Sequence, residues 1–426
     1  MRILGLVTAA LCVAPFAAQA SEVGDMVAWH LSAGTAVAGQ AELQTARDAG
    51  EPEACFAWSM LGLASAFEGL ALDLYRYGAT TPGTPTAALL LGLGSMDTGM
   101  PPAPINPDPE PMGYDDLRLM LSDFRADLEA AQAGFECGGA AGTDYVVPLD
   151  VLKARIDFNG DGQVEEGESL GLVLAPLMGD FGADAVATEK SISKGMGRDT
   201  SIGFDAADSI WLAGYTQVLA VQLDLLLAHG FSDFYAAYLH RVFPAASLPM
   251  QDYIRGGSLM LDPDSDSGIA DLIAAVHTLN FPVVDRPLLQ AIPAKLHHIT
   301  ALSRQNWELI LAETDDNREL LPSPRQTSLI PDMAISEESV TAWRETLDVL
   351  DQIIDGRLLI PHWRFQKGFD LAAYFAEAER TDLVLLLTGQ AAVPYLRDGP
   401  VADAQSFAAA NRVFGERLID YSFWFN

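Results

Sequence analysis

The chain has 426 residues, of which 50% are hydrophobic and 19% are charged. This length and composition are enough to bury a core in about two or three domains, and they argue against wholesale disorder. Lys and Arg total 25 against 58 Asp and Glu, which gives a formal net charge of -33. So large an acidic excess excludes nucleic acid as a partner, because phosphate binding needs a basic surface.

The first twenty residues have the pattern of a secretory signal peptide. Arg2 gives a positive start, an apolar stretch follows to Phe16, and a small-x-small cleavage motif ends at Ala20. The apolar stretch is too short to span a membrane, and no later run reaches that length without a charge or a helix breaker. We therefore expect residues 1–20 to be removed and the protein to be exported, periplasmic or secreted, with no membrane span.

The next region, 21–145, is predicted to be helical with a proline-rich insert. Apolar residues recur at steps of three and four over 54–75 and again over 114–135, and an alanine-rich stretch at 26–48 precedes them. Eight prolines lie between residues 82 and 111, so the insert at 76–113 cannot be one continuous helix.

Two cysteines, Cys55 and Cys137, remain once the signal peptide is removed. An even number in an oxidising compartment favours one disulfide between them. The alternative is a pair of buried free thiols.

Residues 157–168 read DFNGDGQVEEGE and carry the strongest chemical signal in the sequence. Oxygen-bearing side chains alternate at positions 1, 3 and 5, and Gly162 at position 6 permits a sharp turn. The segment resembles the calcium loop of EF-hand proteins, a resemblance that covers only these residues and predicted flanking helices. It implies one calcium ion (Ca2+) held by Asp157, Asn159, Asp161, the carbonyl of Gln163, Glu165 through a water molecule, and both oxygens of Glu168. A solvated acidic turn and a magnesium site are the alternatives.

A second acidic segment, 262–273, copies part of this pattern. Asp262, Asp264 and Asp266 match positions 1, 3 and 5, and Asp271 could replace the missing acid at position 12. Ser267 stands where the glycine should be, however. The segment is therefore either a degenerate partner loop for calcium or the acidic start of a helix.

The remaining region, 146–426, is also predicted to be helical. Helical spacing is strongest over 204–229, continues over 287–314 with a break expected near Pro293, and returns over 337–354. Two short apolar runs, 357–360 and 382–387, could pair as a small ribbon or form short buried helices. A further irregular part is expected near 178–203.

Histidines are the other candidates for chemistry, but none forms a recognisable catalytic pattern. The sequence has no HExxH, GxSxG or CxxC motif and no glycine-rich phosphate loop. Structural roles at helix ends or in the core are the more ordinary interpretation. The candidates are His229 and His240 with Asp233 and Arg241, the adjacent His297 and His298, and His362 in an aromatic corner.

The sequence thus predicts a mostly helical, multi-helix globular bundle with one EF-hand-like helix–loop–helix and few or no strands. The leading functional hypothesis is an exported calcium-binding protein whose ion is chiefly structural. An exported hydrolase and a solute-binding protein, each with a calcium-stabilised helical scaffold, are the alternatives. A hydrolase would need a pocket that gathers the histidines with carboxylates, and a solute-binding protein would need a cleft.

Overall fold

A computed structural model describes residues 21–79, 105–174, 200–246, 248–249, 263–328, 335–415 and 418–425. The predicted signal peptide, residues 80–104 of the proline-rich insert and residues 175–199 lie outside these ranges. Helices dominate the described part of the chain, as the sequence predicts, and the strands are short.

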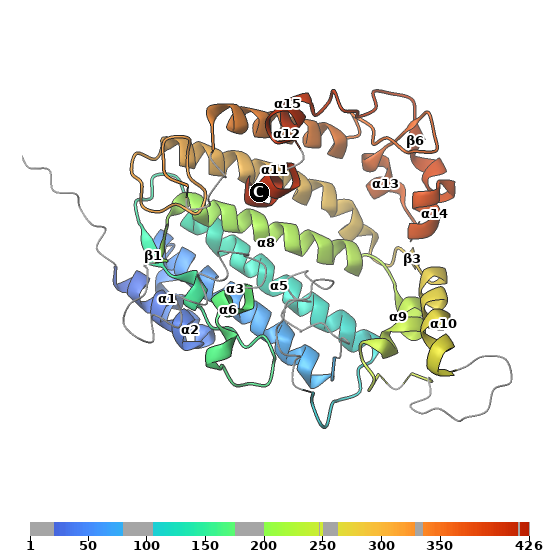
Figure 1. The fold of residues 1–426 in the computed structure, drawn as a ribbon, viewed down its shortest axis with the longest axis horizontal. Coiled ribbons are helices and arrows are strands. Elements are labelled where there is room, and N and C mark those ends of the chain that lie inside the picture. The colour runs from blue at the N-terminus through green and yellow to red at the C-terminus, as the bar shows by residue number, and fades with distance from the viewer. Residues whose placement is uncertain are drawn as a thin grey trace, which may run out of the picture.

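Five long helices form a stack in which each packs on the next in chain order (Figure 1). Each of these helices corresponds to a predicted helical stretch. Four of them begin and end within a few residues of the prediction, and the fifth, at 337–354, has the predicted bounds. The members are α3 (Pro52–Arg76), α5 (Tyr114–Gly138), α8 (Ala206–Leu227), α11 (Arg286–Ala312) and α12 (Glu337–Ile354).

The middle helix, α8, is buried on two sides because α5 and α11 flank it. It is accordingly apolar around most of its circumference. Phe56 of α3, Phe135 of α5 and Ile210 of α8 meet in one core cluster, in which all three side chains are buried. A second cluster joins Trp307 of α11 and Trp343 of α12 to the C-terminal helices α15 (Ala408–Val413) and α16 (Leu418–Phe425).

Two shorter helices, α1 (Glu22–Ala33) and α2 (Ala36–Asp48), pack against α3 at one end of the stack (Figure 1). The alanine-rich stretch at 26–48 falls on these two helices. Gly34 adopts a left-handed conformation (φ +65°), which ends α1 and turns the chain into α2.

The small elements occupy the ends of the stack. The described ranges contain three antiparallel pairs of strands, β1 (Val147–Leu149) with β2 (Ile202–Phe204), β3 (Asn280–Pro282) with β5 (Arg380–Asp382), and β4 (Gly368–Phe369) with β6 (Leu396–Arg397). The remaining short helices are α6 (Leu170–Leu174), α9 (Ser232–Tyr238), α10 (Pro263–His277), α13 (Leu371–Glu377), α14 (Leu383–Thr388) and the 3-10 helices η1 (Val151–Lys153), η2 (Glu166–Glu168), η3 (Leu239–Arg241) and η4 (Gln390–Tyr395).

Two local expectations differ from this structure. The chain stays helical through Pro293, so α11 has no break there. The proposed ribbon between 357–360 and 382–387 is wrong, because the second run forms α14 and Ile360 instead bridges Phe369. Short apolar runs do not distinguish a strand from a helix. The second run is helical from Leu383, but this helix is not buried, because Leu383, Leu385 and Leu387 are exposed.

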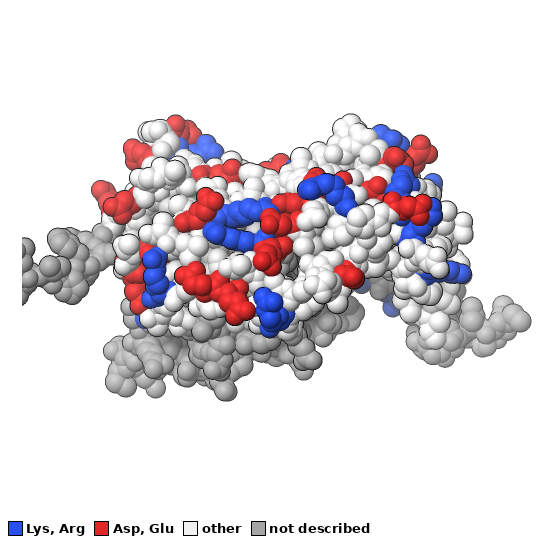
Figure 2. Space-filling view, turned by 90° about the horizontal axis from the view of Figure 1, so that it is seen from above, with Lys and Arg blue, Asp and Glu red and all other residues white. Residues whose placement is uncertain are grey.

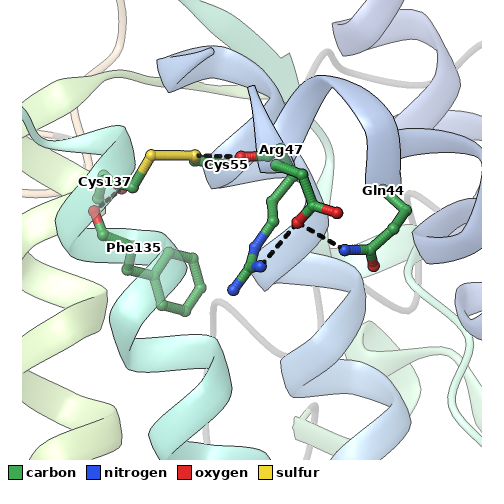
Figure 3. Close-up of a disulfide and its surroundings, with 7 residues drawn as sticks. Gln44, Arg47, Cys55, Phe135 and Cys137 are labelled. Atoms are coloured by element: carbon green, nitrogen blue, oxygen red, sulfur yellow. Dashed lines mark hydrogen bonds and ion pairs between the residues drawn. A yellow bond between two sulfur atoms is a disulfide. The ribbon is translucent and has the colours of Figure 1, made fainter. Parts of the chain in front are cut away.

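The two cysteines meet at the contact between α3 and α5. Cys55 and Cys137 form a disulfide with a Cα–Cα distance of 5.8 Å (Figure 3). Arg47 of α2 lies beside it, and its carbonyl oxygen is 3.7 Å from the Cys55 sulfur. The predicted pairing therefore fits the fold.

The surface on the α12 side carries both signs of charge despite the large acidic excess. Figure 2 shows Lys and Arg side chains set among Asp and Glu on this face. Arg304 of α11, for example, reaches Asp348 at 2.9 Å and Asp351 at 2.7 Å, which ties α11 to α12. Such surface pairs contribute little stability each, but they cancel part of the negative field locally.

Two helices, α3 and α8, are long and apolar enough to cross a membrane by length and composition alone. About half of the residues in each apolar window are buried inside the fold. Core helices of water-soluble proteins meet the same criterion, so this observation is weak evidence for a span.

Candidate metal centre

The Asp157–Glu168 segment folds as a tight loop built around the Asp157 carboxylate. Its Oδ1 accepts a hydrogen bond from the Gly160 amide at 2.7 Å, and its Oδ2 accepts one from the Gly162 amide at 2.8 Å. Both glycines have positive φ, +71° and +82°, a conformation that other residues rarely adopt. The two glycines thus let the backbone wrap around the first acidic residue of the loop.

The next two polar side chains of the pattern each accept a hydrogen bond from one backbone amide of the loop. Asn159 Oδ1 accepts from the Asp161 amide at 2.8 Å, and Asp161 Oδ1 accepts from the Gln163 amide at 2.9 Å. These turns fold the side chains at positions 1, 3 and 5 back onto the loop's own backbone. All three therefore lie along the loop rather than extending away from it.

The last residue of the pattern, Glu168, closes the loop from the opposite side. Its Oε2 accepts from the Glu165 amide at 2.9 Å, and its Oε1 accepts from the Asn159 amide at 3.2 Å. Only 8% of Glu168 and 3% of Asp157 are exposed to solvent. The loop thus brings its first and last carboxylates together in a largely buried position.

Two helical neighbours hold the loop in place. A side chain at Gly160 would overlap the carbonyl oxygen of Ala71 in α3, so the loop backbone lies directly on that helix. Val164 packs against Gly34 at the end of α1, where a side chain would overlap it. The apolar residue at position 8 therefore contacts a helix end rather than a second calcium loop.

A third acidic residue, Glu68 of α3, faces the same site. Its Oε1 lies 3.5 Å from the Asp157 amide. Burial, together with the nearby charges of Asp157 and Glu168, raises the pKa of Glu68 to about 7. Burial also raises the pKa values of Asp157 and Glu168 themselves. Three carboxyl groups therefore gather where their ionised forms are destabilised, and a bound cation would offset that cost.

The sequence gives no direct signal for Glu68, because it lies 89 residues before Asp157 in a mostly apolar helix. The stretch 54–75 also contains Asp73, so an acidic residue there does not single out Glu68. Its role depends on the packing of the loop against α3.

The segments flanking the loop differ from the predicted helix–loop–helix. No helix enters the loop, because β1 and the single turn of η1 precede it and the Arg155 amide donates to the Leu31 carbonyl at 2.9 Å. Arg155 also bridges Ser169, and the Leu170 amide donates to Ala154 at 2.8 Å, so the two ends of the loop are joined as a short ladder. Only the exit leads into a helix, the five-residue α6.

The second acidic segment is helical rather than looped. Asp264 and Asp266 belong to α10, and their side chains and Asp262 lie outside what the structure describes. Asp271 pairs with Arg241 and lies 3.2 Å from His240. The structure thus matches the other interpretation, the acidic start of a helix.

A separate group of acids, which we call the α8 acid cluster, surrounds the start of α8. It consists of Asp205, Asp208, Glu313 and Glu319, and one oxygen from each of Asp205, Glu313 and Glu319 lies within 4.8 Å of the other two. Burial is the largest cause that raises the pKa values of all four, and repulsion from neighbouring acids, including Asp315 outside the cluster, adds to it. The pKa values of Glu313 and Glu319 rise to about 8. Sequence reasoning missed this cluster because its members come from segments about one hundred residues apart.

The candidate histidines do not assemble into one site within the described ranges. Each histidine forms hydrogen bonds with different partners. His229 bonds to Leu225 and Thr381, His240 to Asp271, His297 to Asp351 and Asp355, His298 to Glu136, and His362 to Leu386.

Comparison with models of protein families finds no match, and comparisons with curated proteins and with solved structures likewise find none.

Proposed function

We propose that this chain is an exported calcium-binding protein in which the Asp157–Glu168 loop holds one calcium ion. The observation that carries the proposal is the convergence of two buried carboxylates, Asp157 and Glu168, from the two ends of a glycine-turned loop. Asn159, Asp161 and the Gln163 carbonyl would supply further oxygen ligands, and Glu165 would act through a water molecule. This donor set consists of oxygen alone, which suits a hard divalent cation.

Calcium fits this donor set better than magnesium. A loop of this kind offers about six to eight oxygens at adaptable positions, whereas magnesium requires a strict octahedron and keeps several waters. The ion would be chiefly structural, because the loop joins α1, α3 and the β1–β2 pair. Binding to the folded state alone would stabilise that junction by mass action.

Export is supported by two features that lie apart from the loop. The disulfide between Cys55 and Cys137 is typical of an oxidising compartment. Cleavage after Ala20 would leave Ser21 in place, and Ser21 Oγ caps α1 by accepting from the Gly24 amide at 2.8 Å. Removal of the predicted signal peptide would therefore preserve the first helix cap.

Calorimetric titration of calcium into the chelator-treated mature protein tests the proposal. We expect one ion to bind, and Asp157→Ala and Glu168→Ala to abolish the signal. Glu166→Gln is the matched control, because Glu166 is an exposed acid of the same loop outside the ligand pattern. Absence of binding at millimolar calcium, or loss of binding in the control alone, would refute the proposal.

A further inference from the structure

A cavity of about 340 Å³ opens between α1, β1 and η1, next to the calcium loop. This volume lies at the lower end of the range for small-molecule sites, so it suits a ligand of one ring. Its lining combines an apolar side with a polar side and includes Trp29, Leu31, Ser32, Pro148, Asp150 and Lys153.

The apolar side is formed largely by a tryptophan that the fold leaves open to solvent. Trp29 is 60% exposed, although it belongs to a helix whose other face is buried. Its ring meets His30 edge-on, with centroids 4.6 Å apart, so one neighbour already restricts its orientation. An ordered, exposed aromatic face beside a cavity is suited to stacking against a ring with an apolar face.

The polar side carries no net charge. Asp150 Oδ2 accepts from Lys153 Nζ at 2.8 Å and from Thr200 Oγ1 at 2.7 Å. The Lys153 side chain is 48% exposed, and the hydroxyl oxygen of Ser32 lies nearby as an acceptor. Because the carboxylate and the ammonium cancel, the cavity favours an uncharged ligand that both donates and accepts hydrogen bonds.

We propose that this cavity binds a single neutral sugar residue. A sugar ring has an apolar C–H face that can stack on Trp29 and an edge of hydroxyl groups that can bond to Asp150, Lys153 and Ser32. Neither a charged metabolite nor a wholly apolar ligand satisfies both sides of the cavity.

The loop at 157–168 does not line the cavity, but the elements that do are tied to it. The Leu31 carbonyl accepts from the Arg155 amide at 2.9 Å, and Val164 packs on Gly34 directly after the helix that carries Trp29. Asp150 and Lys153 stand just before the loop in the chain. Calcium should therefore fix the cavity's shape and strengthen sugar binding, a consequence that rests on the proposed function.

The test is saturation-transfer difference NMR of the mature protein with methyl glycosides of glucose, galactose, mannose and N-acetylglucosamine, with calcium and with chelator. We expect millimolar binding of at least one glycoside with calcium present. Trp29→Ala should weaken it by about tenfold, which is the size of one lost stacking contact. The matched control is Trp363→Ala, because Trp363 is 77% exposed but lies away from the cavity.

Each outcome decides one claim. If none of the four glycosides binds at tens of millimolar, or if Trp29→Ala binds like the wild type, the cavity proposal is overturned. Glycoside binding by a protein that calorimetry shows to bind no calcium would support the cavity and refute the calcium proposal. Equal binding with calcium and with chelator, in a protein that does bind calcium, would refute only the coupling between them.

Discussion

The Asp157–Glu168 loop and the α8 acid cluster both bury carboxylates, but the carboxylates differ in their hydrogen-bond partners. In the loop, Asp157 and Glu168 together accept four backbone amides, which come from the loop itself. In the cluster, the amide bonds to Asp205 and Asp208 cap α8, and Glu319 accepts one amide, from Asn317. The pKa values of Glu313 and Glu319 meanwhile rise to about 8.

This contrast separates a loop that wraps its own amides around two carboxylates from a place where acids are tolerated as neutral groups. A local pattern of glycine and alternating oxygens specifies the first arrangement. The α8 acid cluster results from packing distant segments together, and protonation is sufficient to remove the cost of burying its charges. Closeness of its carboxylates alone therefore does not identify the cluster as a metal site.

Replacing Gly160 should have the largest effect on the loop. Gly160→Ala places a methyl group against the Ala71 carbonyl in a left-handed conformation, so we expect a loss of about 3–4 kcal/mol in unfolding free energy. Gly162→Ala is the control, because Gly162 has a similar φ but open space around it, and it should cost only about 1 kcal/mol. Denaturant titration measures both, and equal losses would show that the loop does not rest on α3.

Calcium should distinguish the two acidic regions directly. At a hundredfold excess over its Kd, the ion should stabilise the wild type by about 2.7 kcal/mol. Asp157→Ala should lose this increment and Glu319→Gln should keep it. Thermal unfolding with calcium and with chelator provides the measurement, and an increment lost only in Glu319→Gln would place the ion in the cluster.

The α8 acid cluster should make stability depend on pH. Glu313 and Glu319 ionise near pH 4.5 in the unfolded chain but hold their protons to about pH 8 when folded. The folded state binds more protons between these values, so its stability falls as the pH rises from about 4.5 to about 8. Glu319→Gln should therefore stabilise the protein by about 1–2 kcal/mol at pH 9 and leave it unchanged at pH 4. Melting temperatures in chelator at both pH values test this, and a stabilising effect confined to pH 4 would contradict it.

The smallest expected effect concerns Glu68. Removing its charge with Glu68→Gln should weaken calcium binding by about threefold. This is the contribution to affinity expected from one nearby negative charge whose attraction is partly screened by water. Glu22→Gln, which alters an exposed acid in the first turn of α1, should leave the affinity unchanged. Calorimetry at neutral pH compares them, and tighter binding by Glu68→Gln would show that Glu68 hinders the ion.

The sequence predicts the long helices well because each spans many turns of a regular apolar pattern. The ends of α12, Glu337 and Ile354, coincide with the predicted ones because Ser336 caps the start and Gly356 follows the end. Periodicity cannot identify the segment before Asp157, where apolar spacing suggests a helix but the chain instead pairs with Ser169 and Leu31. Glu68, the α8 acid cluster and the cavity beside Trp29 are products of tertiary packing, which no local pattern records.

The disulfide between α3 and α5 has a consequence for how the chain behaves when it is cut. Cys55 and Cys137 are 82 residues apart, so every peptide bond between them lies inside a covalent ring. A single protease cut in that ring would leave one molecule of unchanged mass, apart from an added water. It would migrate as one band until a reductant released two fragments. A protein built this way can lose a peptide bond in the ring and still keep α3 bound to α5.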